Sequence, residues 1–202
     1  MKKIIASIAI FFAFVVAGYF LFQMNIGSGS KPGNSAVLID QEAALLSSAP
    51  SGWILDHAAA TQMGMCAVYV LKDHNFETSP YLIYPRFAEK GGDAAITAAI
   101  QELAAIYKSH SAGFSLEEKD DYTSKQGLVF KVRYFWDGPP PRGFEAVAYL
   151  TYKEKLYISV YSTKSRDEFL KQVSSFYSYL DTVAPYSLAS AADKCLYPAG
   201  PQ

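Results

Sequence analysis

The sequence predicts an α+β protein: a central antiparallel sheet with helices packed on its faces (an α/β/α sandwich), preceded by an N-terminal transmembrane helix. Residues 128–136 and 144–152 have the period-two pattern and the β-branched and aromatic content of half-buried strands. Residues 165–183 instead place apolar side chains three or four positions apart, as an amphipathic helix does. An apolar sheet face and an apolar helix stripe bury each other, which favours a layered fold.

The N-terminal prediction rests on residues 4–22, nineteen residues without a charge that follow Lys2 and Lys3. This length is near the roughly 20 residues that span a bilayer and exceeds the about 7–15 of a signal-peptide core. An uncleaved signal anchor and a signal peptide cut after Ala17 both remain open. In either case the lysines stay in the cytoplasm and the rest is exported. The expected location is the inner membrane, single pass, with the C-terminal domain in the periplasm, or secreted if the signal is cleaved.

Composition divides the chain into four parts. Residues 1–26 form the anchor or signal peptide, 27–36 a flexible linker rich in glycine and serine, 37–186 a single domain, and 187–202 a tail. The net charge is −1 and charges of both signs are interspersed, so no basic surface for nucleic acid is expected.

The first half of the domain has weak local signals. Residues 37–46 are compatible with a short helix. Short strands are expected at residues 53–55, 66–71 and 81–84, and Pro85 is expected to close the last of them because proline cannot donate to a sheet ladder.

A helix is predicted from Asp93, as its N-cap, to about Tyr107, with an alanine-rich apolar stripe typical of close packing on a sheet. Residues 114–122 are polar and charged, as in an exposed strand or loop. After the strands at 128–136 and 144–152, a third strand is expected from Leu156.

The polar turn at residues 153–155 is short enough for a hairpin, which makes the sheet antiparallel. The C-terminal helix begins after Ser165, because Glu168 lies three residues later at the capping-box spacing. Pro185 is expected to stop it.

This order of elements resembles the PsbP/Mog1-like fold. The resemblance is carried by Tyr81-Leu82-Ile83-Tyr84, the helix from Asp93, the strands at 127–136, 144–152 and 156–161, and the helix from Ser165. It implies helices on both faces of a central antiparallel sheet. Proteins of that fold act mainly as non-enzymatic partners, such as lumenal subunits that assemble on membrane complexes. No functional motif matches, so no site residue is carried over.

Cys66 and Cys195 are the two cysteines. In an exported protein they are expected to form a disulfide if their Cα atoms come within about 7 Å. The alternative is a buried Cys66 and a free thiol in the tail. A redox enzyme would need a local C-x-x-C pair, which the sequence lacks.

No motif predicts a catalytic residue, a cofactor or a metal site. His57, His74 and His110 are scattered, without the spacing of a local metal site, and are expected on the surface. The alternative is a small-ligand or metal-binding periplasmic domain, or a hydrolase, whose site brings two of these histidines together with carboxylates.

The loop between the first two strands is the candidate contact surface. It carries three consecutive prolines, it includes Arg142, and it is flanked by Trp136 and Phe144, whose side chains are expected to be exposed. Stiff loops with aromatic and arginine side chains have the composition of protein interfaces; the alternative is a rigid hairpin connection. The predicted function is therefore a membrane-anchored extracytoplasmic domain that binds another envelope protein without catalysis. A structural component of the envelope or of a secretion system would share these features.

Overall fold

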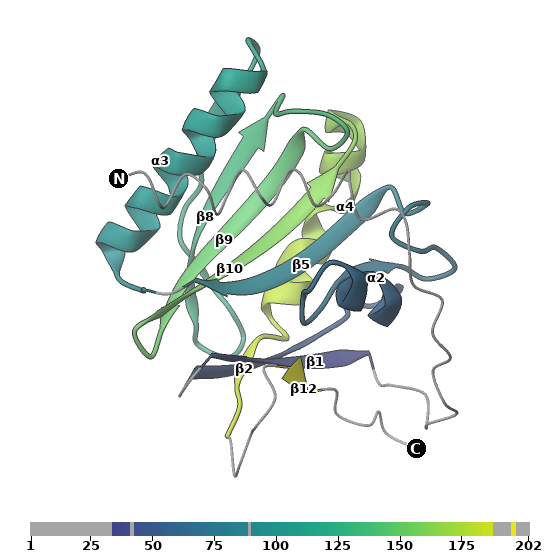
Figure 1. Cartoon of the computed structure of the whole chain (residues 1–202), viewed down its shortest axis with the longest axis vertical. Coiled ribbons are helices and arrows are strands. Elements are labelled where there is room, and N and C mark those ends of the chain that lie inside the picture. Colours follow the sequence, from purple (N-terminus) through teal and green to yellow (C-terminus); the bar gives the residue numbers. More distant parts are fainter. Residues whose placement is uncertain (1–33, 41–42, 89, 188–194, 197–202) are drawn as a thin grey trace.

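An antiparallel sheet runs through the middle of the protein (Figure 1). The computed structural model describes residues 34–40, 43–88, 90–187 and 195–196. The strand order is β3 (Trp53–Leu55), β4 (Tyr69–Leu71), β5 (Tyr81–Ala88), β10 (Lys155–Thr163), β9 (Phe144–Tyr152), β8 (Val129–Trp136) and β6 (Ser115–Glu118). A two-residue strand, β7 (Tyr122–Thr123), also pairs with β8.

The centre of the sheet is the hairpin that the sequence predicts. β9 and β10 pair without interruption from Tyr152 opposite Lys155 to Phe144 opposite Thr163. Lys153 and Glu154 at the turn both have positive φ, as a two-residue type I′ turn requires. β10 pairs along its other edge with β5, and β9 with β8, so all three predicted strands after residue 127 are confirmed.

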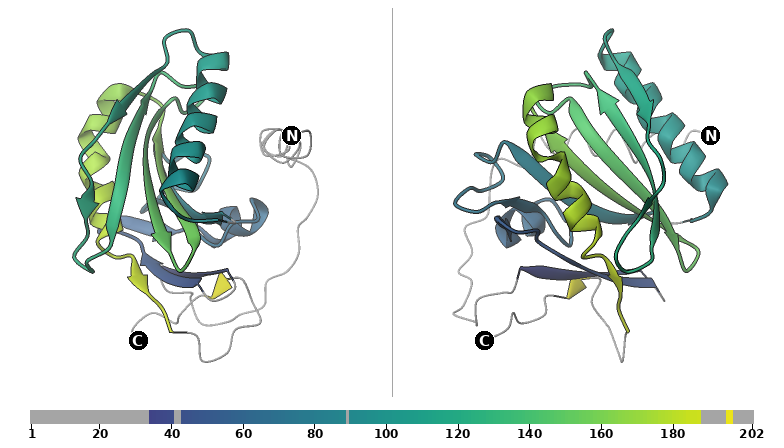
Figure 2. Two further views of the ribbon diagram at one scale, coloured as in Figure 1. Left: turned by 90° about the vertical axis from the view of Figure 1, so that its left-hand side faces the viewer. Right: turned by 180° about the vertical axis from the view of Figure 1, so that it is seen from behind.

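Helices cover both faces of this sheet (Figure 2). The helix α3 (Asp93–His110) and the short α2 (His57–Gln62) lie on one face, and α4 (Arg166–Leu180) lies on the other. The predicted α/β/α arrangement is confirmed. The predicted transmembrane helix falls in residues 1–26, outside the described residues, and within the described part no helix has the length and apolar character to span a bilayer.

Each face has its own core. Toward α4 the fully buried side chains are mostly aromatic: Tyr157, Tyr161, Phe169, Phe176 and Tyr179. Toward α3 they are mostly aliphatic, with aromatic residues at one end: Ile96, Tyr107, Phe135, Val147, Leu156 and Ile158. Alternate residues of β8, β9 and β10 therefore enter opposite cores, as the period-two pattern requires.

The two long helices begin differently. Ser165 caps α4 as predicted, with its hydroxyl accepting a hydrogen bond from the Glu168 amide. The predicted Asp93 cap of α3 is wrong, because Gly92 occupies the N-cap position. The Gly92 amide donates to the Thr151 hydroxyl at 2.7 Å, so a side chain of β9 holds the backbone at the start of the helix. Asp93 lies in the first turn, where its carboxylate faces Lys131 at 3.6 Å.

The short helix expected at residues 37–46 is wrong. β1 (Ser35–Asp40) and β2 (Ala43–Ser48) form an antiparallel pair, flanked by β11 (Ala184–Pro185) and β12 (Cys195–Leu196) in a second, four-stranded sheet. The flanking strands come from the other end of the chain, so no local pattern reveals them. Ala36, Leu38 and Leu45 are buried in the α4 core, and this burial decides in favour of strands.

Pro85 does not close its strand. β5 continues to Ala88, with Pro85 opposite Ser159 of β10. On its other side β5 pairs with β4 at Leu82 and Ile83, before the proline is reached. At Pro85 the strand therefore has one described neighbour, and a missing amide hydrogen is tolerated as it is on an edge strand.

Candidate functional site

The structure brings the three predicted contact residues together at one end of the large sheet. Trp136 ends β8, Phe144 begins β9, and Arg142 lies in the connecting loop at residues 137–143. Because β10 is antiparallel to β9, it ends here too, and the first turn of α4 starts at the same end. Contact with a partner through these residues stays a prediction, but the surroundings of each are now defined.

Trp136 is buried just below the surface. It is 7% exposed, and its ring centroid lies 4.7 Å from that of Phe169 and 6.4 Å from that of Phe144. The Arg166 guanidinium covers the indole, 4.8 Å from the ring centroid, a distance at which cation–π attraction operates. The interpretation of Trp136 as an exposed aromatic is therefore wrong, because Arg166 and the aromatic core cover it.

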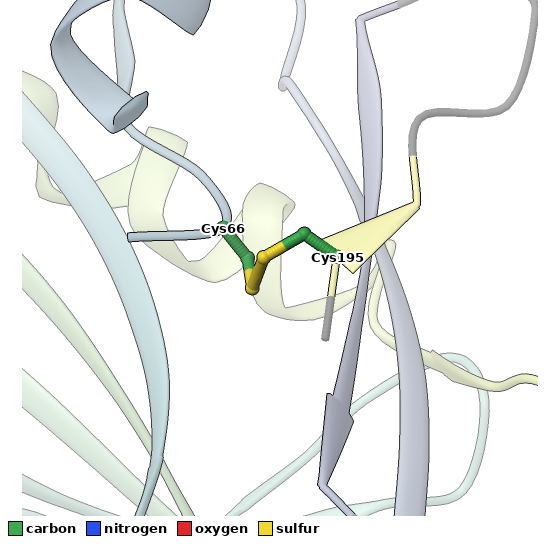
Figure 3. The surroundings of a disulfide bond; sticks show 2 residues. All are labelled: Cys66 and Cys195. Atoms are coloured by element: carbon green, nitrogen blue, oxygen red, sulfur yellow. A yellow bond between two sulfur atoms is a disulfide. The ribbon is translucent and has the colours of Figure 1, made fainter. Parts of the chain in front are cut away.

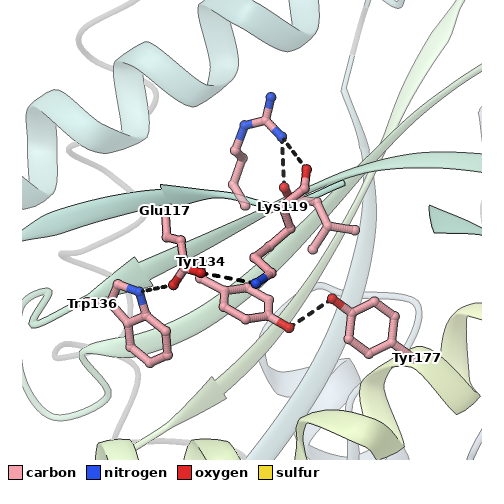
Figure 4. A network of polar contacts seen from close by, with 7 residues as sticks. Glu117, Lys119, Tyr134, Trp136 and Tyr177 are labelled. Carbon is pink, nitrogen blue, oxygen red and sulfur yellow. Dashed lines mark hydrogen bonds and ion pairs between the residues drawn. The ribbon is translucent and has the colours of Figure 1, made fainter. Parts of the chain in front are cut away.

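A polar network fixes the orientation of Trp136 (Figure 4). Its Nε1–H donates to Glu117 Oε2 at 2.9 Å, and Lys119 Nζ donates to Glu117 Oε1 at 3.0 Å. The bonds from Lys119 and Trp136 lower the pKa of Glu117. Lys119 also lies over the Tyr134 ring, and the Tyr134 hydroxyl is 2.8 Å from that of Tyr177 on α4. Strand β6 and helix α4 are thus joined across β8 by side chains.

Arg142 holds the loop in place by two hydrogen bonds. Its two terminal nitrogens donate to the carbonyl oxygens of Ser79 at 2.7 Å and Pro80 at 3.0 Å, just before β5. The loop is therefore tied to a strand that is not its sequence neighbour. Pro140 and Pro141, joined by a cis peptide bond, remain exposed at its tip.

Four side chains at this end of the sheet are exposed, and we call them together the rim surface: Pro140 and Pro141 on the loop, and Arg166 and Leu170 on α4. Arg166 and Leu170 are neighbours at the i, i+4 spacing of one helix face. Leu170 is 60% exposed, the most exposed large apolar side chain in the described part of the chain. An apolar side chain beside an arginine, above buried aromatics, has the composition of an interface core.

A buried carboxyl group lies directly below the rim surface. Glu145 follows Phe144 on β9 and is 5% exposed. Its Oε2 accepts a hydrogen bond from the Tyr107 hydroxyl at 2.5 Å, and the Ser162 hydroxyl donates to the carboxylate as well. Burial raises the pKa of Glu145 to about 7, against the opposing effect of these two donors and of the Arg142 charge.

Three phenols surround this carboxyl group. Burial, and next the negative charge of Glu145, raise the pKa values of Tyr84, Tyr107 and Tyr149. The phenols therefore remain protonated at neutral pH, and Tyr107 acts as a donor to Glu145. This cluster links helix α3 to the central strands.

The three histidines lie on separate elements. His57 begins α2, His74 is exposed in the connection between β4 and β5, and His110 ends α3, where its Nδ1 is 3.0 Å from the Ser109 hydroxyl. Within residues 34–187, apart from 41–42 and 89, and at 195–196, no group of three or more His, Cys, Asp and Glu side chains is arranged to hold a metal ion.

Cys66 and Cys195 form the predicted disulfide, with Cα atoms 5.2 Å apart (Figure 3). Cys66 lies in the segment that leads into β4 of the large sheet, and Cys195 lies in β12 of the small one. The bond therefore joins the two sheets across a sequence separation of 129 residues. It also places residues 195–196, from the predicted tail, on β1.

Comparison with known proteins finds likeness of fold. No protein-family model and no curated protein matches the sequence. The chain is similar to the solution structure of cyanobacterial PsbP from Synechocystis sp. PCC 6803, with a TM-score of 0.46 and 15% identity over 80% of this chain and 98% of that one. It is also similar to the crystal structure of the Ran-binding protein Mog1p of Saccharomyces cerevisiae, with a TM-score of 0.44 and 16% identity over 75% and 93%. These two structures are a PsbP and a Mog1 protein, the proteins after which the fold suggested by the order of elements is named.

Sequence reasoning missed three residues of this region. Arg166 and Leu170 are on the outward side of a helix, where nothing in the pattern shows which strand end lies beside them. Glu145 did leave a signal: it is the one charged residue in the strand at 144–152, on the face that also presents Val147 and Tyr149. A single carboxylate on an otherwise apolar strand face indicates a buried polar group that needs partners.

Proposed function

We propose that this protein is a membrane-anchored, extracytoplasmic domain that binds a protein of the cell envelope through its rim surface and does not catalyse a reaction. The observation that carries the proposal is the preorganised loop: Arg142 ties residues 137–143 to the Ser79 and Pro80 carbonyls and leaves Pro140 and Pro141 exposed. A loop that is already ordered loses little conformational entropy when a partner binds.

The chemistry of the rim surface supports a protein partner. Leu170 offers apolar area to a partner, and Arg166 offers guanidinium donors while its position above Trp136 is stabilised. Arginine is among the residue types that contribute most binding energy at protein interfaces.

Two features support the location. The Cys66–Cys195 disulfide is stable in oxidising compartments and rare in the cytosol. The uncharged stretch at residues 4–22 is long enough to anchor the chain. Eight residues, 27–34, separate the predicted anchor from β1, and a fully extended chain of that length spans at most roughly 30 Å. The partner would therefore lie in the membrane or close to it.

Site-specific photo-crosslinking in intact cells tests the proposal. A benzophenone amino acid is placed at Pro140 or at Leu170, and as a control at Ala98, which is exposed on the outer face of α3. We expect the same envelope protein to be crosslinked from positions 140 and 170 but not from 98, and the yield to fall with Arg166→Ala. Equal labelling at all three positions, or none at 140 and 170, would refute the proposal.

A further inference from the structure

The buried carboxyl group of Glu145 is linked to the loop at residues 137–143 through two residues. The first is Arg142, whose positive charge acts on Glu145 and whose guanidinium donates to the Ser79 and Pro80 carbonyls. The second is Tyr107, whose hydroxyl donates a hydrogen bond to Glu145.

The contact through Tyr107 is close-packed. A Cβ atom added at Gly138 in the loop would lie 2.7 Å from Cδ2 and 2.9 Å from Cε2 of the Tyr107 ring. The glycine is thus required for the loop backbone to lie on the ring. The Tyr107 ring and the backbone at Gly138 are in close contact. A movement of the ring toward or away from Glu145 would therefore change the packing of the loop.

We propose that the protonation state of Glu145 controls the order of the loop at residues 137–143, and so makes binding at the rim surface pH-dependent. With Glu145 neutral, Arg142 is free to donate to the two carbonyls. When Glu145 is ionised, its buried charge has Arg142 as its available counter-ion, so it competes with Ser79 and Pro80 for the guanidinium. The hydrogen bonds from Arg142 to the Ser79 and Pro80 carbonyls are then lost, and the loop becomes less ordered.

Charged and titratable groups from several elements surround Glu145 and Arg142, and the charge of Glu168 on α4 acts on Arg142 as the charge of Glu145 does. Tyr107 faces Glu145 from α3, Tyr84 from β5, Tyr149 from β9 and Arg142 from the loop. The phenols stay neutral because their pKa values are raised, and Arg142 stays charged, since guanidinium groups do not deprotonate in proteins. Glu145 is therefore the group of this cluster that titrates near neutral pH, about pH 7.

Hydrogen–deuterium exchange on the full chain in detergent micelles tests this directly. Exchange of peptides covering residues 137–143 is measured from pH 6 to pH 8, and the ratio of wild type to Glu145→Gln at each pH cancels the intrinsic rate. With a pKa of about 7, the ionised fraction rises from roughly a tenth to nine-tenths, so we expect the wild-type loop to exchange up to about ninefold faster at pH 8 relative to the variant. Peptides of α4 should show no such ratio change.

A second variant guards against a folding defect in the first. Arg142→Gln removes the hydrogen bonds to the Ser79 and Pro80 carbonyls. Residues 137–143 of this variant should therefore exchange rapidly at both pH 6 and pH 8, without a pH-dependent step. Equal profiles for wild type and Glu145→Gln, or a change spread evenly over the whole sheet, would overturn the inference. The consequence for binding rests on the proposed function, but this measurement uses the protein alone. A failed crosslinking experiment and an absent pH step are therefore separate outcomes.

Discussion

Replacing Glu145 by glutamine should remove a large part of the decrease in stability between pH 4.5 and pH 8. Glutamine keeps the shape of the side chain and can still accept the Tyr107 hydrogen bond, but it has no proton to lose. The comparison therefore isolates the cost of a buried, ionised carboxylate.

The size and sign of the effect follow from the pKa. An ordinary glutamate has a pKa of 4.5, whereas burial raises that of Glu145 to about 7 in the folded protein. Between these values the folded state binds more protons than the unfolded state, so the free energy of unfolding falls as pH rises. Each pKa unit corresponds to about 1.4 kcal/mol, so the full loss is about 3 kcal/mol and is complete slightly above pH 7.

Urea unfolding followed by tryptophan fluorescence at pH 4.5, 6, 7 and 8 measures this. Wild type should lose about 3 kcal/mol over the range relative to Glu145→Gln, with most of the loss complete by pH 7. Glu102→Gln makes the same chemical change on the exposed face of α3 and should leave the wild-type profile unaltered. Parallel profiles for wild type and Glu145→Gln would refute the assignment of a raised pKa to Glu145.

Three further predictions concern the scaffold. Reducing the disulfide, or replacing Cys66 and Cys195 by serine, should lower the free energy of unfolding by roughly 4–5 kcal/mol in the chain-entropy model, and melts of the double variant should no longer respond to reductant; an unchanged wild-type melt under reduction would contradict this. Phe176→Ala should cost about 3–5 kcal/mol because the side chain is fully buried, whereas Leu170→Ala, 60% exposed, should stay within about 0.5 kcal/mol; similar costs in urea unfolding would be inconsistent with the packing. Ser165→Ala should cost about 1 kcal/mol by removing the α4 cap, and a thermal melt that matches wild type would count against that role.

The candidate site was only partly visible in the sequence. The composition of the loop singled out one end of the sheet, and Trp136 and Phe144 do contact each other there; binding of a partner at this end stays a prediction. The burial of Trp136 could not be foreseen, because Arg166 and Phe169, which cover it, follow about thirty residues later in the chain. The role of Arg142 also depends on distant carbonyl groups that precede β5.

The sequence by itself determined the central hairpin, the helix after Ser165 and the arrangement of a sheet between helices. In these segments the hydrophobic period, the turn residues and the cap agree with one another, so local preference and tertiary packing favour the same structure. The Cys66–Cys195 disulfide was also predicted from the sequence, on the premise that the domain is exported.

The tertiary structure alone decided the second sheet, the continuation of β5 through Pro85, and the network below the rim surface. β1 and β2 are strands because segments from the opposite end of the chain pair with them and the α4 core buries them. Burial raises the pKa of Glu145, and it outweighs the hydrogen bonds from Tyr107 and Ser162 and the charge of Arg142, which lower it. Each of these outcomes depends on contacts between residues far apart in the chain, and short-range patterns carry no information about such contacts.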